Sequence, residues 1–464
     1  MDTRTEADSF GERQVPKDVY WGIQTLRAVE NFPVSGQKAP TVFIYAYVQV
    51  KKAAARANMQ VGWLDETLGG AIVQACDEVL AGKLLNQFVV DVFQAGAGTS
   101  FNMNVNEVLA NRALELLGKK RGDYKCISPN DHVNMSQSTN DTFPTALHVA
   151  ALLALEPLVV ALSDLSEAFA RLSRKYESVM KSGRTHLQDA LPITIGQEFG
   201  AYAAAIDKAR QQLKGRSKGL DELALGGTAV GSGVNAHANY ASIAIAELSK
   251  MAGFAFKPAS NCFEALQSRS AVASISGALK ELALELIRIA NDLRLLSSGP
   301  TTGLAEITLP AVQPGSSIMP GKVNPVMAEC LDMVAFQVVG NDLATSLAIQ
   351  AGQLELNVMM PVMMYNLLQS IQLLSNFIPV FTSKCVDGIT VDAAKCMAYV
   401  ENNPSLAVFL SPTIGYLEAA KIAKQALEEK RSVKEIALKK GVLKPEQAKE
   451  IFEKDYLLGK KGRK

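Results

Sequence analysis

Apolar residues recur along this chain mainly at helical spacing. The clearest series consists of Ile275, Leu279, Leu282, Leu286, Ile289, Leu293 and Leu296. Its intervals alternate between four and three residues, which is the heptad pattern of a long helix packed in a bundle. The series stops at Ser297-Ser298-Gly299-Pro300, because glycine suits a helix C-cap and proline cannot continue the helix.

The same spacing predicts further long helices at Ala146–Lys181, Gly196–Arg216, Val326–Leu347 and, starting after Pro361, through Phe381. Alternating runs typical of strands are nearly absent, so the predicted fold class is mainly α. Apolar seams of this length usually bury several neighbours and often pair across subunits. We therefore expect a homo-oligomer built on a central helical bundle.

Breaks in the pattern predict three domains. An N-terminal mixed helical domain is expected over 1–135, a central long-helix bundle over 136–389, and a small helical domain over 390–464. The last contains short charged helices predicted at Ser432–Lys440 and Pro445–Lys454.

Composition narrows the class of protein. Of the 464 residues 48% are apolar, and 47 Lys and Arg nearly balance 46 Asp and Glu, so neither disorder nor nucleic-acid binding is expected. The basic run at 460–464 is expected to be a solvated end. Six cysteines without metal-type spacing, no secretory leader and no apolar run long enough for a bilayer predict a cytoplasmic protein with reduced thiols.

Two polar stretches precede predicted helices. Gly96–Asn104 combines glycines with Thr99 and Ser100, whose simplest interpretation is a helix N-cap but which also suits an approaching anion. Asn134–Thr142 holds more polar side chains than capping needs. A helix N-terminus favours a carboxylate, although a solvent-exposed turn is the alternative.

Two further stretches carry ionisable or nucleophilic groups. His186 lies within Gly183–Ala190 among Arg, Thr, Gln and Asp, where a histidine can hold a polar group, relay a proton or be purely structural. The loop Pro314–Asn324 holds two serines and Lys322 between prolines and glycines, which suits an oxyanion nest on an active-site lid. Glu329 is expected to anchor Lys322 if the chain is helical after Pro325. Signatures of nucleotide-binding, zinc-dependent and serine-hydrolase enzymes are missing.

These four stretches, in this order, resemble the fumarase/aspartase superfamily. The loop Gly315-Ser316-Ser317-Ile318-Met319-Pro320-Gly321-Lys322-Val323-Asn324-Pro325 matches its signature, and the likeness runs from Tyr20 to Tyr416. The resemblance implies a three-domain fold whose central bundles assemble into a tetrameric twenty-helix core. It also implies active sites shared by three subunits and the elimination of ammonia or water from a small dicarboxylic acid.

The resemblance also implies a role for each polar residue. Ser316 would act as an alkoxide general base, with His186 as a second catalytic residue near the leaving group, beside Asn140. The residues expected to hold the carboxylate where charge develops are Thr99, Ser138, Thr139 and Ser317. Those expected to hold the other carboxylate are Thr185, Lys322 and Asn324. No metal ligand and no required cofactor are expected, with activation by Mg²⁺ as in some members left open.

Within the superfamily the sequence most resembles the aspartase branch, which acts on L-aspartate and fumarate. Thr139, the stretch Gln353–Met359 and Val326-Met327 carry this choice. Thr142–Ala146 and Tyr45–Val50 read more like class II fumarases, so a fumarate hydratase is the main alternative, and a non-catalytic structural member is another. Argininosuccinate- and adenylosuccinate-type lyases fit less well. The chain departs from the family pattern at Thr301, Met360 and Ser411-Pro412-Thr413, which leaves substrate detail open.

Overall fold

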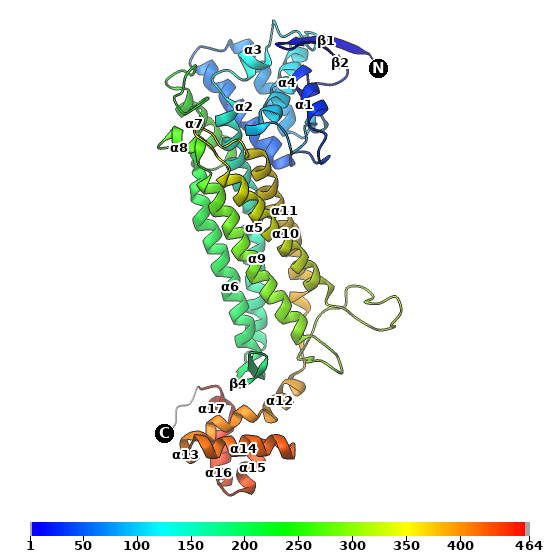
Figure 1. Ribbon diagram of the computed structural model, residues 1–464, viewed down its shortest axis with the longest axis vertical. Helices are drawn as coiled ribbons and strands as arrows, with labels where there is room; N and C mark the ends of the chain where they lie inside the picture. The colour runs from blue at the N-terminus through cyan, green and yellow to red at the C-terminus, as the bar shows by residue number, and fades with distance from the viewer. Residues whose placement is uncertain (1, 460–464) are drawn as a thin grey trace. The chain divides into compact units, whose positions relative to one another are not determined.

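The fold is mainly α-helical, as predicted (Figure 1). A computed structural model describes residues 2–459. The N-terminal elements are β1 (Thr3–Asp8), β2 (Gly11–Pro16), α1 (Ile23–Asn31), α2 (Thr41–Gln60), α3 (Glu66–Leu80), η1 (Leu85–Gln87), η2 (Gly96–Gly98), α4 (Thr99–Leu116) and the π-helix η3 (Pro129–Val133). The basic run at 460–464 lies outside the described residues.

Five long helices follow, with short elements between and after them. The long helices are α5 (Thr139–Lys175), α6 (Ile195–Ser217), α9 (Ser270–Leu296), α10 (Val326–Gln350) and α11 (Met360–Lys384). Between them lie β3 (Met180–Thr185), β4 (Gln188–Thr194), η4 (Lys218–Asp221), β5 (Glu222–Leu223), α7 (Tyr240–Ala252), β6 (Lys257–Pro258), α8 (Cys262–Gln267) and β7 (Ile307–Thr308). After them come η5 (Val386–Gly388), β8 (Thr390–Val391), α12 (Ala393–Glu401), η6 (Pro404–Leu410), α13 (Ser411–Ile414), α14 (Tyr416–Glu429), α15 (Val433–Lys439), α16 (Pro445–Ile451) and α17 (Lys454–Leu457).

The chain divides into two compact units, and each long helix contributes a stretch to both. The first unit comprises residues 2–160, 209–283 and 335–375, and the second comprises 161–208, 284–334 and 376–459. This division follows contacts within the chain, so the predicted boundaries at 135/136 and 389/390 stay predictions.

In the first unit, α2 packs against α3 and α7, and α4 packs against α1 and α3. An aromatic cluster of Phe43, Tyr47, Phe101 and Phe143 joins α2 to the starts of α4 and α5, with ring centroids 4.9 to 6.0 Å apart. The bundle part is tied together by Asp342 of α10, which accepts hydrogen bonds from Ser276 Oγ and Lys280 Nζ of α9, both at 2.6 Å.

In the second unit, polar contacts also join the long helices. Tyr202 of α6 donates to Asp292 of α9 at 3.1 Å, and Arg294 of α9 pairs with Asp332 of α10 at 2.9 Å. The strands β3 and β4 form an antiparallel hairpin with an irregularity between Ser182 and Arg184. The small C-terminal helices enclose a separate apolar cluster that includes Leu410, Ile422 and Ile436.

Most predicted long helices are confirmed. The heptad series lies within α9, which ends at Leu296, directly before Ser297 as the sequence indicates. Helices α6 and α10 agree with their predicted ranges to within three residues, and α11 begins at Met360, one residue before Pro361. The short charged helices are α15 and α16, of which α15 begins with Ser432 in a capping box.

The helix predicted at Ala146–Lys181 was wrong at both ends. It begins at Thr139, because Ser138 and Asp141 form the cap described below, and it ends at Lys175. Residues Met180–Thr185 form strand β3 instead, since His186 and Leu187 adopt the positive φ values, 56° and 59°, of a tight two-residue hairpin turn. The polar hairpin β1–β2 was also not predicted.

Helix α5 is relevant to the prediction that no apolar stretch is long enough to span a bilayer. Among the described residues it is the one helix that passes the test of length and composition for crossing a membrane. However, 61% of its most apolar window is buried inside the protein. Such burial is typical of a core helix.

Candidate active site

The polar stretch 134–142 forms the start of helix α5. Ser138 Oγ accepts a hydrogen bond from the backbone N–H of Asn140 at 3.2 Å, and the backbone N–H of Ser138 donates to Asp141 Oδ1 at 3.0 Å. This reciprocal arrangement resembles a capping box. The stretch is therefore a structured helix N-terminus rather than a plain exposed turn, and α5 directs its free N–H groups toward the polar side chains.

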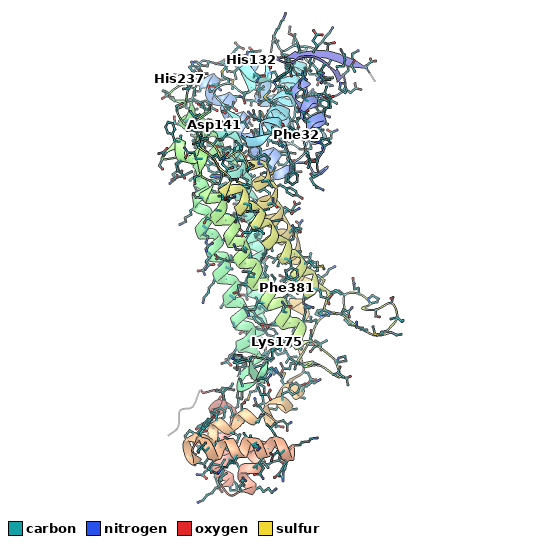
Figure 2. All side chains as sticks on the ribbon, viewed as in Figure 1. Phe32, His132, Asp141, Lys175, His237 and Phe381 are labelled. Atoms are coloured by element: carbon teal, nitrogen blue, oxygen red, sulfur yellow. The ribbon has the colours of Figure 1, made fainter. Side chains whose placement is uncertain are left out.

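Asp141, which Figure 2 labels, and its neighbour Asn140 tie this helix start to a second loop. Its Oδ2 accepts hydrogen bonds from the backbone N–H groups of Gly226 and Thr228, both at 3.0 Å. Asn140 Nδ2 donates to the carbonyl oxygen of Ala229 at 2.7 Å. Burial raises the pKa of Asp141 to about 7, against the lowering effect of its three backbone hydrogen bonds.

The polar stretch 96–104 forms the start of helix α4. The N-cap is Gly98, in the left-handed region at φ 84°, and no side chain caps the helix, so the expected Thr or Ser cap is absent. A Cβ atom at Gly98 would lie 2.1 Å from the ring of Phe143 in α5. The glycine therefore lets the starts of α4 and α5 approach each other closely.

One pocket of about 700 Å³ in the first unit brings these two helix starts together. The four predicted substrate-binding residues among its lining are Thr99, Ser138, Thr139 and Asn140. Further amides line it, among them Asn102, Asn134 and Gln137. A pocket with hydroxyls, amides and two helix N-termini suits a carboxylate. The spacing of residues in the sequence did not predict that the starts of α4 and α5 line the same pocket.

A lysine that the sequence pattern did not single out lies behind this pocket. Lys51 of α2 is fully buried, and its Nζ donates to Asn102 Oδ1 at 2.7 Å and to Asn134 Oδ1 and Gln137 Oε1, both at 3.0 Å. Burial lowers the pKa of Lys51 to about 7. One sequence feature could have revealed this lysine. It lies on a helical face that is otherwise apolar and that includes Tyr47, Val48 and Ala55.

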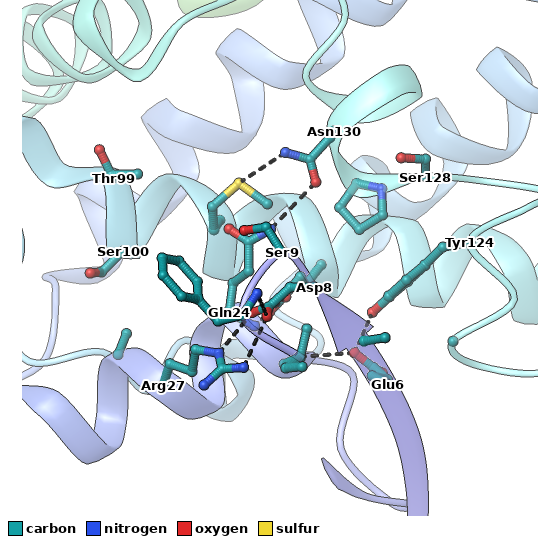
Figure 3. A pocket seen from close by; sticks show the side chains of 18 of the residues that line it. Glu6, Asp8, Ser9, Gln24, Arg27, Thr99, Ser100, Tyr124, Ser128 and Asn130 are labelled. Atoms are coloured by element: carbon teal, nitrogen blue, oxygen red, sulfur yellow. Dashed lines mark hydrogen bonds and ion pairs between the residues drawn. The ribbon is translucent and has the colours of Figure 1, made fainter. Parts of the chain in front are cut away.

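A larger pocket of about 1100 Å³ adjoins Thr99 but contains no other predicted site residue (Figure 3). Its lining is held by internal pairs, such as Arg27 with Asp8 at 2.8 Å. The lining also carries the carboxyl groups of Glu107, Asp123 and Asp131, so the smaller pocket fits the predicted carboxylate site better.

In the second unit, Thr185 and His186 lie at the exposed turn between β3 and β4. The base of this hairpin is firmly anchored. Fully buried Glu306 pairs with Arg184 at 2.9 Å and with Lys181 at 3.3 Å. Asn403 Nδ2 donates to Ser182 Oγ at 3.0 Å and to the carbonyl of Ala190 at 2.7 Å. These contacts anchor the hairpin that carries Thr185 and His186.

The loop 314–324 also belongs to the second unit. Ser316 Oγ accepts hydrogen bonds from the backbone N–H groups of Ile318 at 3.2 Å and Met319 at 2.9 Å. The loop is closed at its base, where Gly315 N–H donates to the carbonyl of Lys322 at 2.8 Å and Asn324 Nδ2 donates to the carbonyl of Gly315 at 2.6 Å. Two N–H donors on one hydroxyl oxygen favour its ionised form.

Other loop residues are more open. Ser317 and Lys322 are exposed, whereas Asn324 is partly buried. Glu329 lies in the first turn of α10, and within residues 2–459 no ion pair joins it to Lys322. The anchoring of Lys322 by Glu329 stays a prediction. No group of three His, Cys, Asp or Glu side chains in the described part of the chain is placed to hold a metal ion. Activation by Mg²⁺ stays a prediction.

The structure thus assembles the predicted residues into three groups. The first unit holds Thr99 and Ser138–Asn140 in one pocket, whereas the second unit holds the hairpin turn and the loop. Each group alone supplies donors for an anion. The loop adds a hydroxyl, that of Ser316, that accepts two backbone N–H groups, an arrangement that suits proton transfer.

Solved structures share this fold. One described as fumarate lyase:delta crystallin from Brucella melitensis bound to cobalt has a TM-score of 0.94 and 50% identity, covering 98% of this chain and 99% of that chain. A recombinant class II fumarase from Schistosoma mansoni has a TM-score of 0.94 and 38% identity, covering 97% and 98%.

Sequence comparison identifies the family. The profile described as Lyase matches residues 11–340, and the profile described as Fumarase C C-terminus matches residues 406–459. An aspartate ammonia-lyase of Bacillus subtilis (strain 168) is 49% identical, covering 99% of this chain and 96% of the relative. A class II fumarate hydratase of Thermosynechococcus vestitus is 47% identical, covering 99% of each. The chain therefore belongs to this lyase family, the fumarase/aspartase superfamily, and is a lyase.

Proposed function

We propose that this lyase is an aspartate ammonia-lyase, which eliminates ammonia from L-aspartate reversibly to give fumarate. The reaction removes a weakly acidic proton from the carbon beside a carboxylate, which then becomes a dianionic aci-carboxylate. Ammonia leaves from the neighbouring carbon as the double bond forms. Stabilising the developing charge with fixed donors supplies most of the catalysis.

The observation that carries this proposal is the environment of Ser316. Its Oγ already accepts two backbone N–H groups, as an alkoxide base requires. Ser317 belongs to the same loop, and Lys322 supplies a nearby positive charge for the second carboxylate. His186, with Asn140, is proposed to contact the leaving amino group. The intact set of these residues argues against a non-catalytic role.

A homotetramer with shared active sites is part of the proposal. Helix α10 exposes an apolar face of Met333, Phe336, Leu343 and Leu347, each 57 to 63% exposed in the single chain. Such a face needs a partner, and other copies of the bundle provide matching faces. The exposed hairpin turn with Thr185 and His186 suits delivery of these residues to a site on another subunit.

The choice of aspartate over malate rests on Thr139 and on Gln353–Met359, which resemble the aspartase branch. Relatives named aspartate ammonia-lyase are 48 to 49% identical, and relatives named class II fumarate hydratase are 47 to 48% identical. The same scaffold with water as the leaving group is therefore the second candidate.

One assay separates the two candidates. Purified protein is given L-aspartate or L-malate, and the ultraviolet absorbance of fumarate is followed. Formation of fumarate from aspartate, and its loss when ammonia is added, is expected. Turnover of malate without aspartate would replace the proposal by the hydratase. Failure with both would favour the non-catalytic alternative.

The remaining parts of the proposal concern cofactor and location. We propose that turnover requires no cofactor, which dialysis against a chelator tests, and that added Mg²⁺ changes the rate at most as an activator. A cytoplasmic location agrees with free thiols, since all six cysteines, which lie within the described residues, are unpaired.

A further inference from the structure

Lys51 is a buried amine, and no carboxylate of residues 2–459 lies at hydrogen-bond distance from it. Its three Nζ partners, Asn102, Asn134 and Gln137, are all neutral amides. Lysine is almost never fully buried unless it is paired with a negative group, because leaving water is costly for a charge. The fold therefore buries an amine whose charged form no adjacent carboxylate stabilises.

No neighbouring group supplies a negative charge in direct contact with Lys51. The titratable groups that act on Lys51 are Asp141 of α5 and Cys76 of α3, both through space, while the ring of Tyr47 has its centroid 5.6 Å from Nζ. Asp141 already accepts three backbone N–H groups. Burial raises the pKa of Cys76 to about 12, so its thiol is neutral.

The three amides that hold Lys51 connect the two helix starts. Asn102 is one turn after Thr99 in α4, and Gln137 directly precedes Ser138. Asn134 joins them, because its Oδ1 also accepts from Asn102 Nδ2 at 3.2 Å and its Nδ2 donates to the carbonyl of Gln137 at 3.2 Å. All three amides line the 700 Å³ pocket. Lys51 is thus one layer behind that pocket.

We propose that Lys51 is a positioning residue that locks the two carboxylate-binding segments together and supplies the positive charge that a bound dicarboxylate neutralises. Binding of the dianion then draws a proton from solvent onto the Lys51 amine, which becomes an ammonium ion. The inference deepens the proposed function, because it rests on a dicarboxylate occupying this pocket. It adds a group that never touches the substrate but sets how strongly the pocket attracts it.

The coupling between dicarboxylate binding and protonation of Lys51 can be measured near neutral pH. Burial lowers the pKa of Lys51 to about 7, so the free protein also contains the neutral amine at mildly alkaline pH. The neutral amine can donate to only two of the three amides, whereas the ammonium ion can donate to all three. A dianion beside it favours the charged form. Net proton uptake on binding is therefore expected at mildly alkaline pH.

The test measures binding of succinate, a dicarboxylate that cannot undergo elimination. Titration calorimetry at one mildly alkaline pH, in two buffers of different ionisation enthalpy, gives affinity and protons taken up. The wild-type protein is expected to take up protons. Lys51→Met is expected to bind succinate at least about tenfold more weakly and to take up none.

Lys52→Met is the matched control. Lys52 is the next residue, is nearly as buried and pairs with Asp77 of α3. It is expected to keep both affinity and proton uptake. A purely structural lysine would lower thermal stability on substitution without changing proton uptake. Unchanged uptake in Lys51→Met, or no uptake or no succinate binding by the wild type, overturns the proposal.

A second variant covers a failure of Lys51→Met to fold. Gln137→Glu places a carboxylate against Lys51 and satisfies its charge within the fold. It is expected to fold, to bind succinate more weakly and to take up no proton, whereas wild-type uptake in this variant contradicts the proposal. Turnover is measured separately, so a chain that binds succinate with proton uptake but processes neither aspartate nor malate rejects only the proposed reaction.

Discussion

Replacing Gly315 by alanine is expected to disable the serine loop while leaving the rest of the fold unchanged. A Cβ atom at this position would lie 2.3 Å from the carbonyl oxygen of Lys322 and 2.8 Å from the backbone nitrogen of Asn324. Both are backbone atoms, so no side chain can rotate away. The hydrogen bond from Gly315 N–H to the Lys322 carbonyl, 2.8 Å long, closes the loop at this point.

The size of the effect follows from the contact distance. Real Cβ contacts are essentially never shorter than 3.0 Å, so the two sides of the loop must separate by at least about 0.7 Å. Ser316 is the next residue and moves with the backbone. Because a misplacement of about 1 Å can slow an enzyme about 100-fold, we expect kcat/KM to fall by roughly two orders of magnitude.

The assay compares kcat/KM and melting temperature with those of the matched variant Gly321→Ala. Gly321 lies in the same loop at φ 79°, and a Cβ atom there would have no other atom within 4 Å, so its replacement strains only the local backbone, by about 1 kcal/mol. Both variants should melt within a few degrees of the wild type, because the loop is exposed. Gly321→Ala should lose much less activity.

Two results refute this reasoning. The first is a Gly315→Ala variant that keeps more than about one fifth of wild-type kcat/KM, since a displaced serine cannot do so. The second is an equal loss in both variants, which would show that general loop strain, rather than the contact with Lys322, controls the position of Ser316.

Three further predictions address single side chains. Ser316→Ala should lower kcat by several orders of magnitude at an unchanged melting temperature, and near-normal turnover would remove Ser316 from the role of base. Lys322→Ala should mainly raise the KM for aspartate, because the loss of this charged contact should weaken binding by about 2 to 4 kcal/mol. An unchanged KM would contradict the role of Lys322 in holding a carboxylate. Asp141→Asn should lower the free energy of unfolding by about 1 to 3 kcal/mol, because an amide offers a single accepting oxygen to the three backbone N–H groups that the two carboxyl oxygens share. Burial raises the pKa of Asp141 to about 7, so its contribution to stability is lost as pH rises toward 7, and denaturant melts should show a larger deficit of the Asn variant at pH 5 than at pH 8. A deficit that grows with pH would reverse this interpretation.

The long helices were predictable because their signal is local. Apolar spacing along α9 and α10, and the break at Ser297–Pro300, follow from helix geometry and from the backbone limits of glycine and proline. Residues 180–194 were not predictable in the same way. Their hairpin depends on positive φ at His186 and Leu187 and on anchoring by Glu306, which is distant in sequence.

The sequence by itself determined the chemical groups available for catalysis and the segments that carry them. Ser316, its glycine-fixed loop and the polar helix starts at Thr99 and Ser138 can be recognised from residue types and order, because loop and capping chemistry is short-range. Only the tertiary structure decided which segments meet. The pocket of Thr99 and Ser138–Asn140 arises where two helices approach over Gly98, and Lys51 becomes a buried cation only because other elements surround it. Burial and electrostatic potential depend on neighbours from distant parts of the chain, and no local pattern encodes them.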